Sequence, residues 1–233
     1  MSAPCPYGLC DGSGFLVDED TLTARDCRCR PQRIAAARTR RLEGRIPAKY
    51  RGAGFDRFPV TEISPPIVSE VRRFAHDIER NLTGGRGIWF VGDVGTGKTT
   101  LAMLVSKAAL DAGHSVAIYS LPRLLNLLRS AIESEEGLLD LLDRLSTVDL
   151  LHIDDVGAEN TTDWALEQLY SIVNTRYEDQ RSLVVTTNLQ PDALAEQIGA
   201  RTVSRLIEMC GDPLPLFGAD KRREYRGDVQ SPV

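Results

Sequence analysis

The run from Gly92 to Thr99 constrains the fold of this 233-residue chain more than any other stretch. It reads Gly-Asp-Val-Gly-Thr-Gly-Lys-Thr and fits the pattern G-x-x-x-x-G-K-[ST] of a phosphate-binding loop. An apolar run, 88–91, precedes it, and a stretch with helical periodicity, 100–110, follows it. Because a strand, a glycine-rich turn and a helix are the setting that this motif requires, the sequence predicts binding of a nucleoside triphosphate. The alternative, an ordinary glycine-rich turn with a surface lysine, does not account for these flanks.

Each residue type in the loop has a chemical reason. Glycines let backbone N–H groups close around phosphate oxygens, and the start of the following helix adds positive partial charge. Lys98 would reach the β- and γ-phosphates of ATP, and the hydroxyl of Thr99 would hold Mg²⁺. The predicted nucleotide-binding residues of this segment are Gly92, Asp93, Val94, Gly95, Thr96, Gly97, Lys98, Thr99 and Thr100.

Two further strands are expected to end in polar residues. The apolar run 150–153 leads into Asp154 and Asp155, which is the Walker B arrangement when it lies beside a phosphate loop. Asp154 would bind Mg²⁺ mostly through water, and Asp155 would polarise the attacking water. Asn188, at the end of the next strand, would orient that water. The alternative for Asp154 and Asp155 is that they only cap a turn before Gly157. The alternative for Asn188 is that it belongs to an ordinary turn.

From residue 66 onward, apolar strands alternate with amphipathic helices. The expected strands are 88–91, 115–119, 149–153 and 182–186, and the expected helices are 66–82, 100–110, 122–145 and 164–177. Nearly continuous apolar strands separated by helices predict an α/β fold with a parallel sheet covered on both faces. The predicted organisation is a cysteine-rich module at 1–31, a basic helical connector at 32–65, an ATPase domain at 66–226 and a tail at 227–233.

Four of the five cysteines lie in the first 31 residues. Cys5, Cys10, Cys27 and Cys29 are expected to bind Zn²⁺, because four thiolates suit its tetrahedral geometry and the segment is too poor in apolar residues to fold unaided. Segment 10–15 resembles one knuckle of the zinc-binding modules of DnaJ-like proteins. An iron–sulfur cluster or an unmetallated arm are the alternatives. The fifth cysteine, Cys210, is expected in the core.

Charge is unevenly distributed along the chain. The net charge is −5, but segment 25–57 holds eleven Lys or Arg and three acids, so it carries +8 and the remainder −13. A basic arm of this kind could contact a phosphate backbone or an acidic protein surface, or simply be a solvated helix face. No apolar run reaches the length of a membrane span and no leader opens the chain, so we expect a cytoplasmic protein without a membrane partner.

Several blocks, taken in order, resemble the DnaC/IstB branch of the AAA+ ATPases. They are 46–51, 55–58, the phosphate loop, 150–159, 184–188, 199–206 and 218–222, and together they cover roughly residues 45–226. The resemblance implies an AAA+ P-loop ATPase domain. It also implies that Arg205 is an arginine finger donated to a neighbouring subunit, an effect worth about 10³–10⁵ in rate. Its alternative is a surface arginine paired with Glu208.

Two other positions take their meaning from the resemblance. Arg222 would be the arginine that senses nucleotide within its own subunit, with Arg223 and Arg226 as alternatives. Glu159 falls inside a family block without an assigned role.

Many AAA+ ATPases have Asp-Glu where this chain has Asp154-Asp155. The side chain of Asp155 is shorter than that of the glutamate, which favours slow hydrolysis.

The function that this resemblance implies is that of a DnaC/DnaI-type helicase loader. Its partners would be a DnaB-type replicative helicase, single-stranded DNA and further copies of the chain on ATP binding. Its DNA contacts would come from Arg123 and Arg129 or from the basic connector. An IstB-type helper that acts with a transposase on duplex DNA is the main alternative. A non-catalytic adaptor and a small-molecule P-loop kinase are the others.

Overall fold

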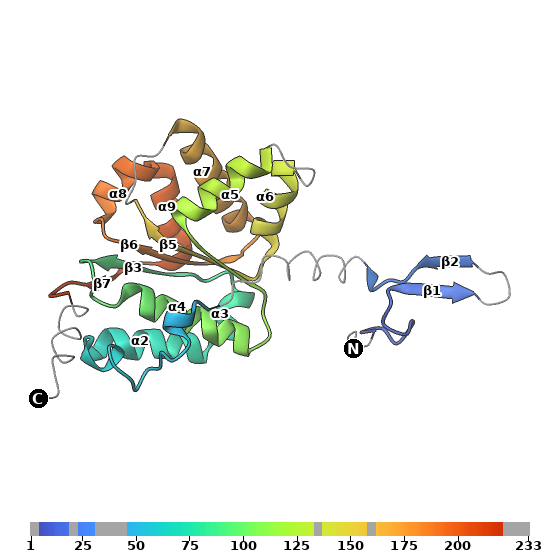
Figure 1. The fold of residues 1–233 in the computed structure, drawn as a ribbon, viewed down its shortest axis with the longest axis horizontal. Coiled ribbons are helices and arrows are strands. Elements are labelled where there is room, and N and C mark those ends of the chain that lie inside the picture. Colours follow the sequence, from blue (N-terminus) through green and yellow to red (C-terminus); the bar gives the residue numbers. More distant parts are fainter. Residues whose placement is uncertain (1–4, 19–22, 31–45, 133–136, 158–161, 221–233) are drawn as a thin grey trace, which may run out of the picture. The chain divides into compact units, whose positions relative to one another are not determined.

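The computed structural model describes residues 5–18, 23–30, 46–132, 137–157 and 162–220 (Figure 1). The chain divides into two compact units, Met1–Leu42 and Glu43–Val233. Residues 32–45 of the expected basic helical connector lie outside the described residues, as do Glu159 and Arg222.

The second unit is built on a five-stranded parallel sheet with the order β4-β5-β6-β3-β7. Its strands are β3 (Ile88–Gly92), β4 (Val116–Ser120), β5 (Leu150–Val156), β6 (Ser182–Thr187) and β7 (Leu214–Leu216). The expected parallel α/β sheet is therefore confirmed. Strand β7 was not predicted, because three residues interrupted by a proline carry no strand pattern of their own.

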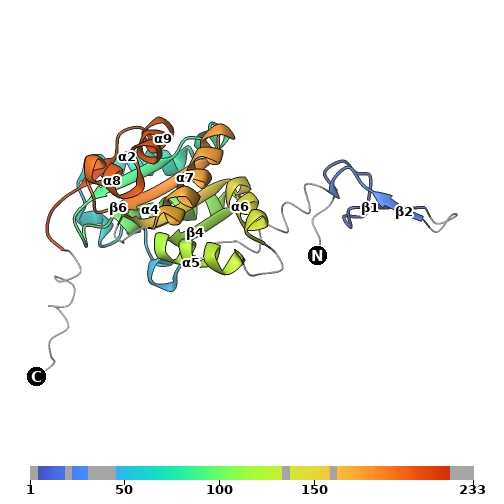
Figure 2. The same ribbon diagram turned by 90° about the horizontal axis from the view of Figure 1, so that it is seen from above.

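Helices cover both faces of this sheet (Figures 1 and 2). One face carries α2 (Pro65–His76), α3 (Ile78–Thr83) and α4 (Lys98–Asp111). The other carries α5 (Leu121–Ile132), α6 (Gly137–Thr147), α7 (Asp163–Glu178), α8 (Pro191–Ile198) and α9 (Ala200–Cys210). Two helices expected as single units are divided. The 122–145 stretch forms α5 and α6, and the 66–82 stretch breaks at Asp77.

The break at Asp77 has a local cause. The side-chain amide of Asn81 donates to the carbonyl of Phe74 at 3.0 Å. In a continuous helix that carbonyl would accept the backbone N–H of Ile78 instead. The apolar face nevertheless continues across the break, since Val71, Ile78 and Leu82 are all buried. The periodicity therefore identified the buried face correctly but not the helix boundary.

The segment that precedes α2 packs into this unit. It contains two short 3₁₀ turns, η1 (Ala48–Tyr50) and η2 (Val60–Glu62), within the stretch that was expected to be connector. Val60 and Ile63 are 1% and 5% exposed and belong to the core between the sheet and α2 and α4. The core of this unit thus includes residues that the sequence assigned to the connector.

The described part of the first unit contains an antiparallel hairpin. Strands β1 (Phe15–Asp18) and β2 (Thr23–Asp26) pair with Phe15 opposite Asp26. The residues of β2 are all exposed, so the hairpin had no apolar alternation by which to be predicted. Cys10 comes before this hairpin and Cys27 directly after it.

Candidate nucleotide site and cysteine cluster

Strand register brings the predicted nucleotide residues to one edge of the sheet. Val91 of β3 pairs with Thr187 of β6, and Thr187 pairs with Val156 of β5. The phosphate loop, which begins as β3 ends, therefore starts beside the strand ends that carry Asp154, Asp155 and Asn188. The carboxyl ends of parallel strands are where α/β proteins bind their ligands.

The phosphate loop is closed around the ammonium group of Lys98. Lys98 is 9% exposed, and its Nζ donates to the carbonyl oxygens of Gly92 at 2.7 Å and Asp93 at 2.6 Å. The hydroxyl of Thr96 donates to the Asp93 carbonyl at 2.9 Å. The loop thus holds a positive charge at the N-terminus of α4, where the helix dipole also favours an anion.

Two loop glycines are required by close packing and by backbone conformation. Gly97, the N-cap of α4, has φ 105°, and a Cβ there would meet Ile63. Gly95 has φ 82°, and a Cβ there would collide with Asp220. Asp93 also accepts the backbone N–H of Gly218 at 3.0 Å. Because these glycines have no side chains, the backbone beside Lys98 is open to the phosphates of a nucleotide. The segment 218–220 lies against the phosphate loop through Asp93 and Gly95.

Asp154 lies among groups that favour its ionised form. Burial opposes ionisation, but His152, the hydroxyl of Thr186 and the hydroxyl of Thr99 together hold the pKa of Asp154 below its usual value. Thr186 Oγ1 donates to Asp154 Oδ1 at 2.7 Å, and His152 Nε2 is 3.9 Å from the same oxygen. A carboxylate and a hydroxyl from Thr99 fit a hydrated Mg²⁺, which prefers oxygen ligands.

Asp155 and Asn188 are exposed at the same edge of the sheet. Asp155 has φ 59°, an uncommon conformation for a residue with a side chain, and its N–H donates to Thr186 Oγ1 at 2.9 Å. Asn188 follows β6 directly. Their predicted roles in orienting water remain predictions.

Arg205 is held by side chains of its own chain, away from the phosphate loop. Its guanidinium donates to Glu208 at 2.9 Å and to Asn174 at 3.3 Å, and it lies over the Tyr177 ring. These partners belong to α7 and α9, on the face of the sheet opposite α4 (Figure 1). The Glu208 pair expected from the sequence is present, and Arg205 does not join the other predicted catalytic residues.

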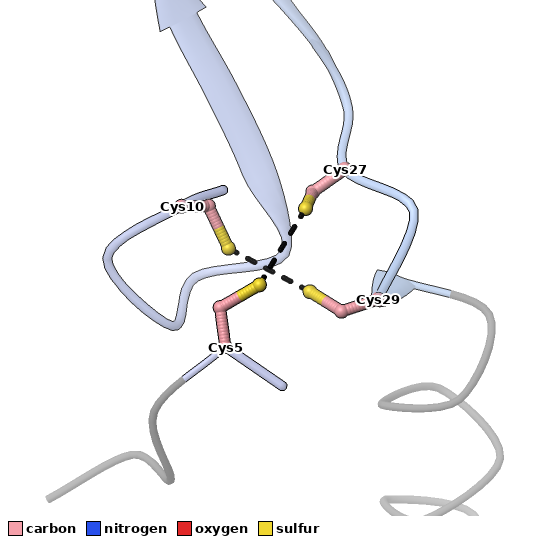
Figure 3. A group of neighbouring side chains, drawn as sticks. All are labelled: Cys5, Cys10, Cys27 and Cys29. Atoms are coloured by element: carbon pink, nitrogen blue, oxygen red, sulfur yellow. Dashed lines mark hydrogen bonds between the residues drawn. The ribbon is translucent and has the colours of Figure 1, made fainter. Parts of the chain in front are cut away.

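The four N-terminal cysteines converge (Figure 3). Their sulfur atoms all lie within 4.8 Å of one another, with Cys5 and Cys27 3.9 Å apart and Cys10 and Cys29 3.6 Å apart. A tetrahedral zinc ion with bonds of about 2.3 Å holds its sulfur ligands about 3.8 Å apart. The thiol positions therefore fit zinc, and they are too far apart for disulfides.

The thiols of the cluster differ in their acidity. Burial and the neighbouring thiols raise the pKa of Cys29 to about 12. Burial also opposes ionisation of Cys5, but backbone N–H groups of Leu9, Cys10 and Tyr7 lower its pKa to about 6. A cation would remove the repulsion between thiolates.

Cys210, expected in the core, is partly exposed, although burial of its thiol raises its pKa to about 12.

A family match covers most of the chain. The sequence model of the IstB-like ATP-binding proteins matches residues 16–207. The chain belongs to this family. ATP is accordingly the nucleotide to which we assign the loop.

The IstB-like chain also resembles individual proteins along most of its length. It is 28% identical over 221 residues to the phage-like element PBSX protein XkdC of Bacillus subtilis, covering 89% of this chain and 80% of that one. It is 26% identical over 200 residues to the replicative helicase loader DnaC of Buchnera aphidicola, covering 83% and 79%.

Solved structures confirm the AAA+ architecture. The crystal structure of the DnaC helicase loader aligns with a TM-score of 0.64 and 27% identity, over 74% of this chain and 99% of that one. AMPPCP-bound DnaA from Aquifex aeolicus aligns with a TM-score of 0.62 and 22% identity, over 77% and 54%. At that identity DnaA supports the fold alone.

Sequence reasoning missed two residues that contact the site from below, Thr186 and His152. Both are buried, at 1% and 0% exposure, and both act on Asp154. Their signal was their position: both are polar residues in largely apolar, buried strands, His152 two residues before Asp154 and Thr186 two residues before Asn188. Among the described residues, no helix is long and apolar enough to cross a membrane.

Proposed function

We propose that this IstB-like protein is an ATP-dependent loader that delivers a DnaB-type hexameric helicase to single-stranded DNA. The observation that carries the proposal is the likeness to helicase loaders named DnaC, which spans 83% of the chain in one relative and includes the nucleotide site. ATP binding and slow hydrolysis would act as a switch between binding and release of the helicase.

The nucleotide site would work through charge and position. Residues 92–100 would wrap the triphosphate, and Lys98 would turn from its loop carbonyls to the β- and γ-phosphates. Thr99 and Asp154 would hold Mg²⁺, which neutralises phosphate charge when bound. Asp155 and Asn188 would orient the attacking water. Arg222 would sense the nucleotide.

Arg205 would complete the site of a second copy. It is about one-third exposed and lies on the opposite side of the sheet from its own α4, which supports action between subunits. A fixed guanidinium stabilises the charge that develops in phosphoryl transfer. ATP would therefore promote assembly of several copies, and single-stranded DNA would contact that assembly through residues such as Arg123 and Arg129.

The N-terminal module would bind the helicase. Cys5, Cys10, Cys27 and Cys29 would hold zinc, and the metal would supply folding free energy that the small hairpin lacks. We retain the division into a module at 1–31, a connector beginning at 32, the ATPase domain and a tail at 227–233. The buried Val60 and Ile63 favour including residues from about 46 onward in the ATPase domain.

The decisive experiment is size-exclusion chromatography of the full chain with the replicative helicase of its own source, with and without Mg-ATP. A stable complex that delivers helicase to a single-stranded oligonucleotide supports the proposal, and Cys29→Ser should weaken that complex. If no complex forms under any nucleotide condition, the loader function is wrong.

A second function is favoured by the family match itself. IstB-type helpers share the ATPase residues, and the IstB-like model matches residues 16–207. A protein of this kind would bind duplex DNA in the presence of ATP and then recruit a transposase. Titration of the same preparation with duplex and single-stranded oligonucleotides of equal length separates the two functions.

A further inference from the structure

We propose that Thr186 is a positioning residue of the nucleotide site, whose hydroxyl fixes the carboxylate of Asp154 and the backbone of Asp155 together. The inference deepens the ATPase activity proposed above and rests on it. Thr186 lies in β6, between the strands that carry the phosphate loop and the two aspartates.

The contacts of Thr186 are specific. Its Oγ1 donates to Asp154 Oδ1 at 2.7 Å and accepts the N–H of Asp155 at 2.9 Å. A hydroxyl has one proton to donate and two lone pairs that accept, so a single threonine can make both bonds at once. Thr186 is 1% exposed, which means that water does not compete for either bond.

The backbone at Asp155 needs this support. The pairing of β5 with β6 is irregular between Ile153 and Val156, which is typical of a β-bulge. Asp155 takes up a left-handed conformation there, with φ 59°, which is unfavourable for a residue with a side chain. In this conformation the backbone N–H of Asp155 donates a hydrogen bond to the Thr186 hydroxyl. It therefore stabilises the bend that points Asp155 out of the strand.

The same hydroxyl orients the carboxylate that would meet the metal. Asp154 Oδ1 accepts a hydrogen bond from Thr186 Oγ1, which fixes how this carboxylate is turned. The other polar group beneath this carboxylate is His152, whose Nε2 lies 3.9 Å from Oδ1, beyond hydrogen-bonding distance. His152 is itself bonded through Nδ1 to Ser106 at 2.9 Å. It is therefore not placed to replace Thr186.

The neighbouring threonine supplies a matched control. Thr187 is also fully buried in β6, but its Oγ1 accepts the N–H of Leu189, two residues along its own chain. Replacing either threonine with valine keeps the shape of the side chain and removes one hydroxyl. A general loss of stability would affect both variants, whereas loss of positioning would affect Thr186→Val alone.

The test compares full-length wild type with Thr186→Val, Thr186→Ser and Thr187→Val. Two quantities are measured: the affinity for a fluorescent ATP analogue with Mg²⁺ and with EDTA, and the Mg²⁺ dependence of ATP hydrolysis. For Thr186→Val we expect unchanged affinity in EDTA and a Mg²⁺ requirement raised about tenfold, the effect of one hydrogen bond to a charged group. We also expect kcat to fall at least about tenfold. Thr186→Ser, which keeps the hydroxyl, should restore both values.

The proposal is overturned if Thr186→Val matches wild type in Mg²⁺ requirement and kcat, if Thr187→Val reproduces its defect, or if Thr186→Ser fails to rescue. Should Thr186→Val melt at a much lower temperature, its affinity in EDTA shows whether the folded site persists, and the comparison of Thr186→Ser with wild type still tests the hydroxyl. Failure to bind a helicase would refute the loader function but leave this comparison unaffected.

Discussion

The guanidinium carbon of Arg205 lies 4.1 Å from the centroid of the Tyr177 ring, and the same guanidinium donates to Glu208, which accepts the Tyr177 hydroxyl as well. Glu208 thus accepts hydrogen bonds from both Tyr177 and Arg205. Through these contacts, helices α7 and α9 hold the guanidinium in one position. An arginine fixed in this way loses little further freedom when it binds a phosphate, which is what a donated finger requires.

Replacing Arg205 with alanine should leave ATP affinity intact and lower hydrolysis by about 10³-fold or more, because the charge that it neutralises develops only during transfer. The measurement is hydrolysis per subunit over a range of protein concentrations. Arg201→Ala, an exposed arginine on the same helix, is the control. Concentration-independent hydrolysis that survives Arg205→Ala would contradict action between subunits.

Replacing Lys98 with alanine should abolish ATP binding, because the loop then loses the buried cation that would turn to the phosphates. Affinity is measured by titration calorimetry. Lys107→Ala is the control, since Lys107 lies on the same helix but pairs with Asp111 at the surface. Equal ATP affinity for wild type and Lys98→Ala would refute the assignment of the phosphate loop.

The purified chain should contain one zinc ion, and Cys29→Ser should remove it, because Cys29 is a fully buried member of the four-thiol cluster. Metal content is measured by mass spectrometry and free thiols by titration. Cys210→Ser should retain the ion. Iron with visible absorption would indicate a cluster, and four reactive thiols without metal would indicate an unmetallated arm.

Among the arginines that the structure describes, Arg176 should be the one whose replacement lowers the stability of the fold most. It is fully buried, and it donates to the carbonyl oxygens of Leu145, Ser146, Asp149 and Ser182. Arg176→Met should lower the free energy of unfolding by about 3 kcal/mol or more, because these carbonyls lose their donor. Urea denaturation measures the change, and Arg181→Ala, at a partly exposed site, should cost far less.

Asp149 should make stability depend on pH. Burial opposes its ionisation, but hydrogen bonds from Ser115, with His114 and Arg181 nearby, lower its pKa below the ordinary 3.8. The folded chain then binds this proton less readily than the unfolded chain, so the carboxylate stabilises the fold above about pH 4 and the contribution is lost below it. Between about pH 6 and pH 3, wild type should lose more stability than Asp149→Asn. Equal losses would contradict this.

Local patterns predicted the strand and the helix that flank the phosphate loop well, because these elements are consecutive in the sequence. The strand, the glycine loop and the helix from Ile88 to Asp111 form one unit with its own apolar periodicity, and Asp154 is identified by the apolar strand before it. The four cysteines were identifiable from their spacing and residue type.

Long-range contacts were not predictable in the same way. The carbonyl taken by Asn81 divides one amphipathic pattern into two helices, because a side-chain hydrogen bond leaves the apolar period unchanged. Strand β7 exists because Phe90 and Val91 offer it a partner, not because Leu214–Leu216 has strand character. The sequence identified Glu208 as a partner for Arg205 but gave no sign of Tyr177, 28 residues away on another helix.

The sequence alone determined which residues are candidates to bind a nucleotide and a metal, since those chemistries depend on residue type and short spacing. Only the tertiary structure determined which side chains hydrogen-bond to those candidates. Thr186 and Asp154 are 32 residues apart, and they meet because β5 and β6 are neighbours in the sheet. Hydrogen bonds of this kind depend on strand order and register, which are properties of the whole packed core.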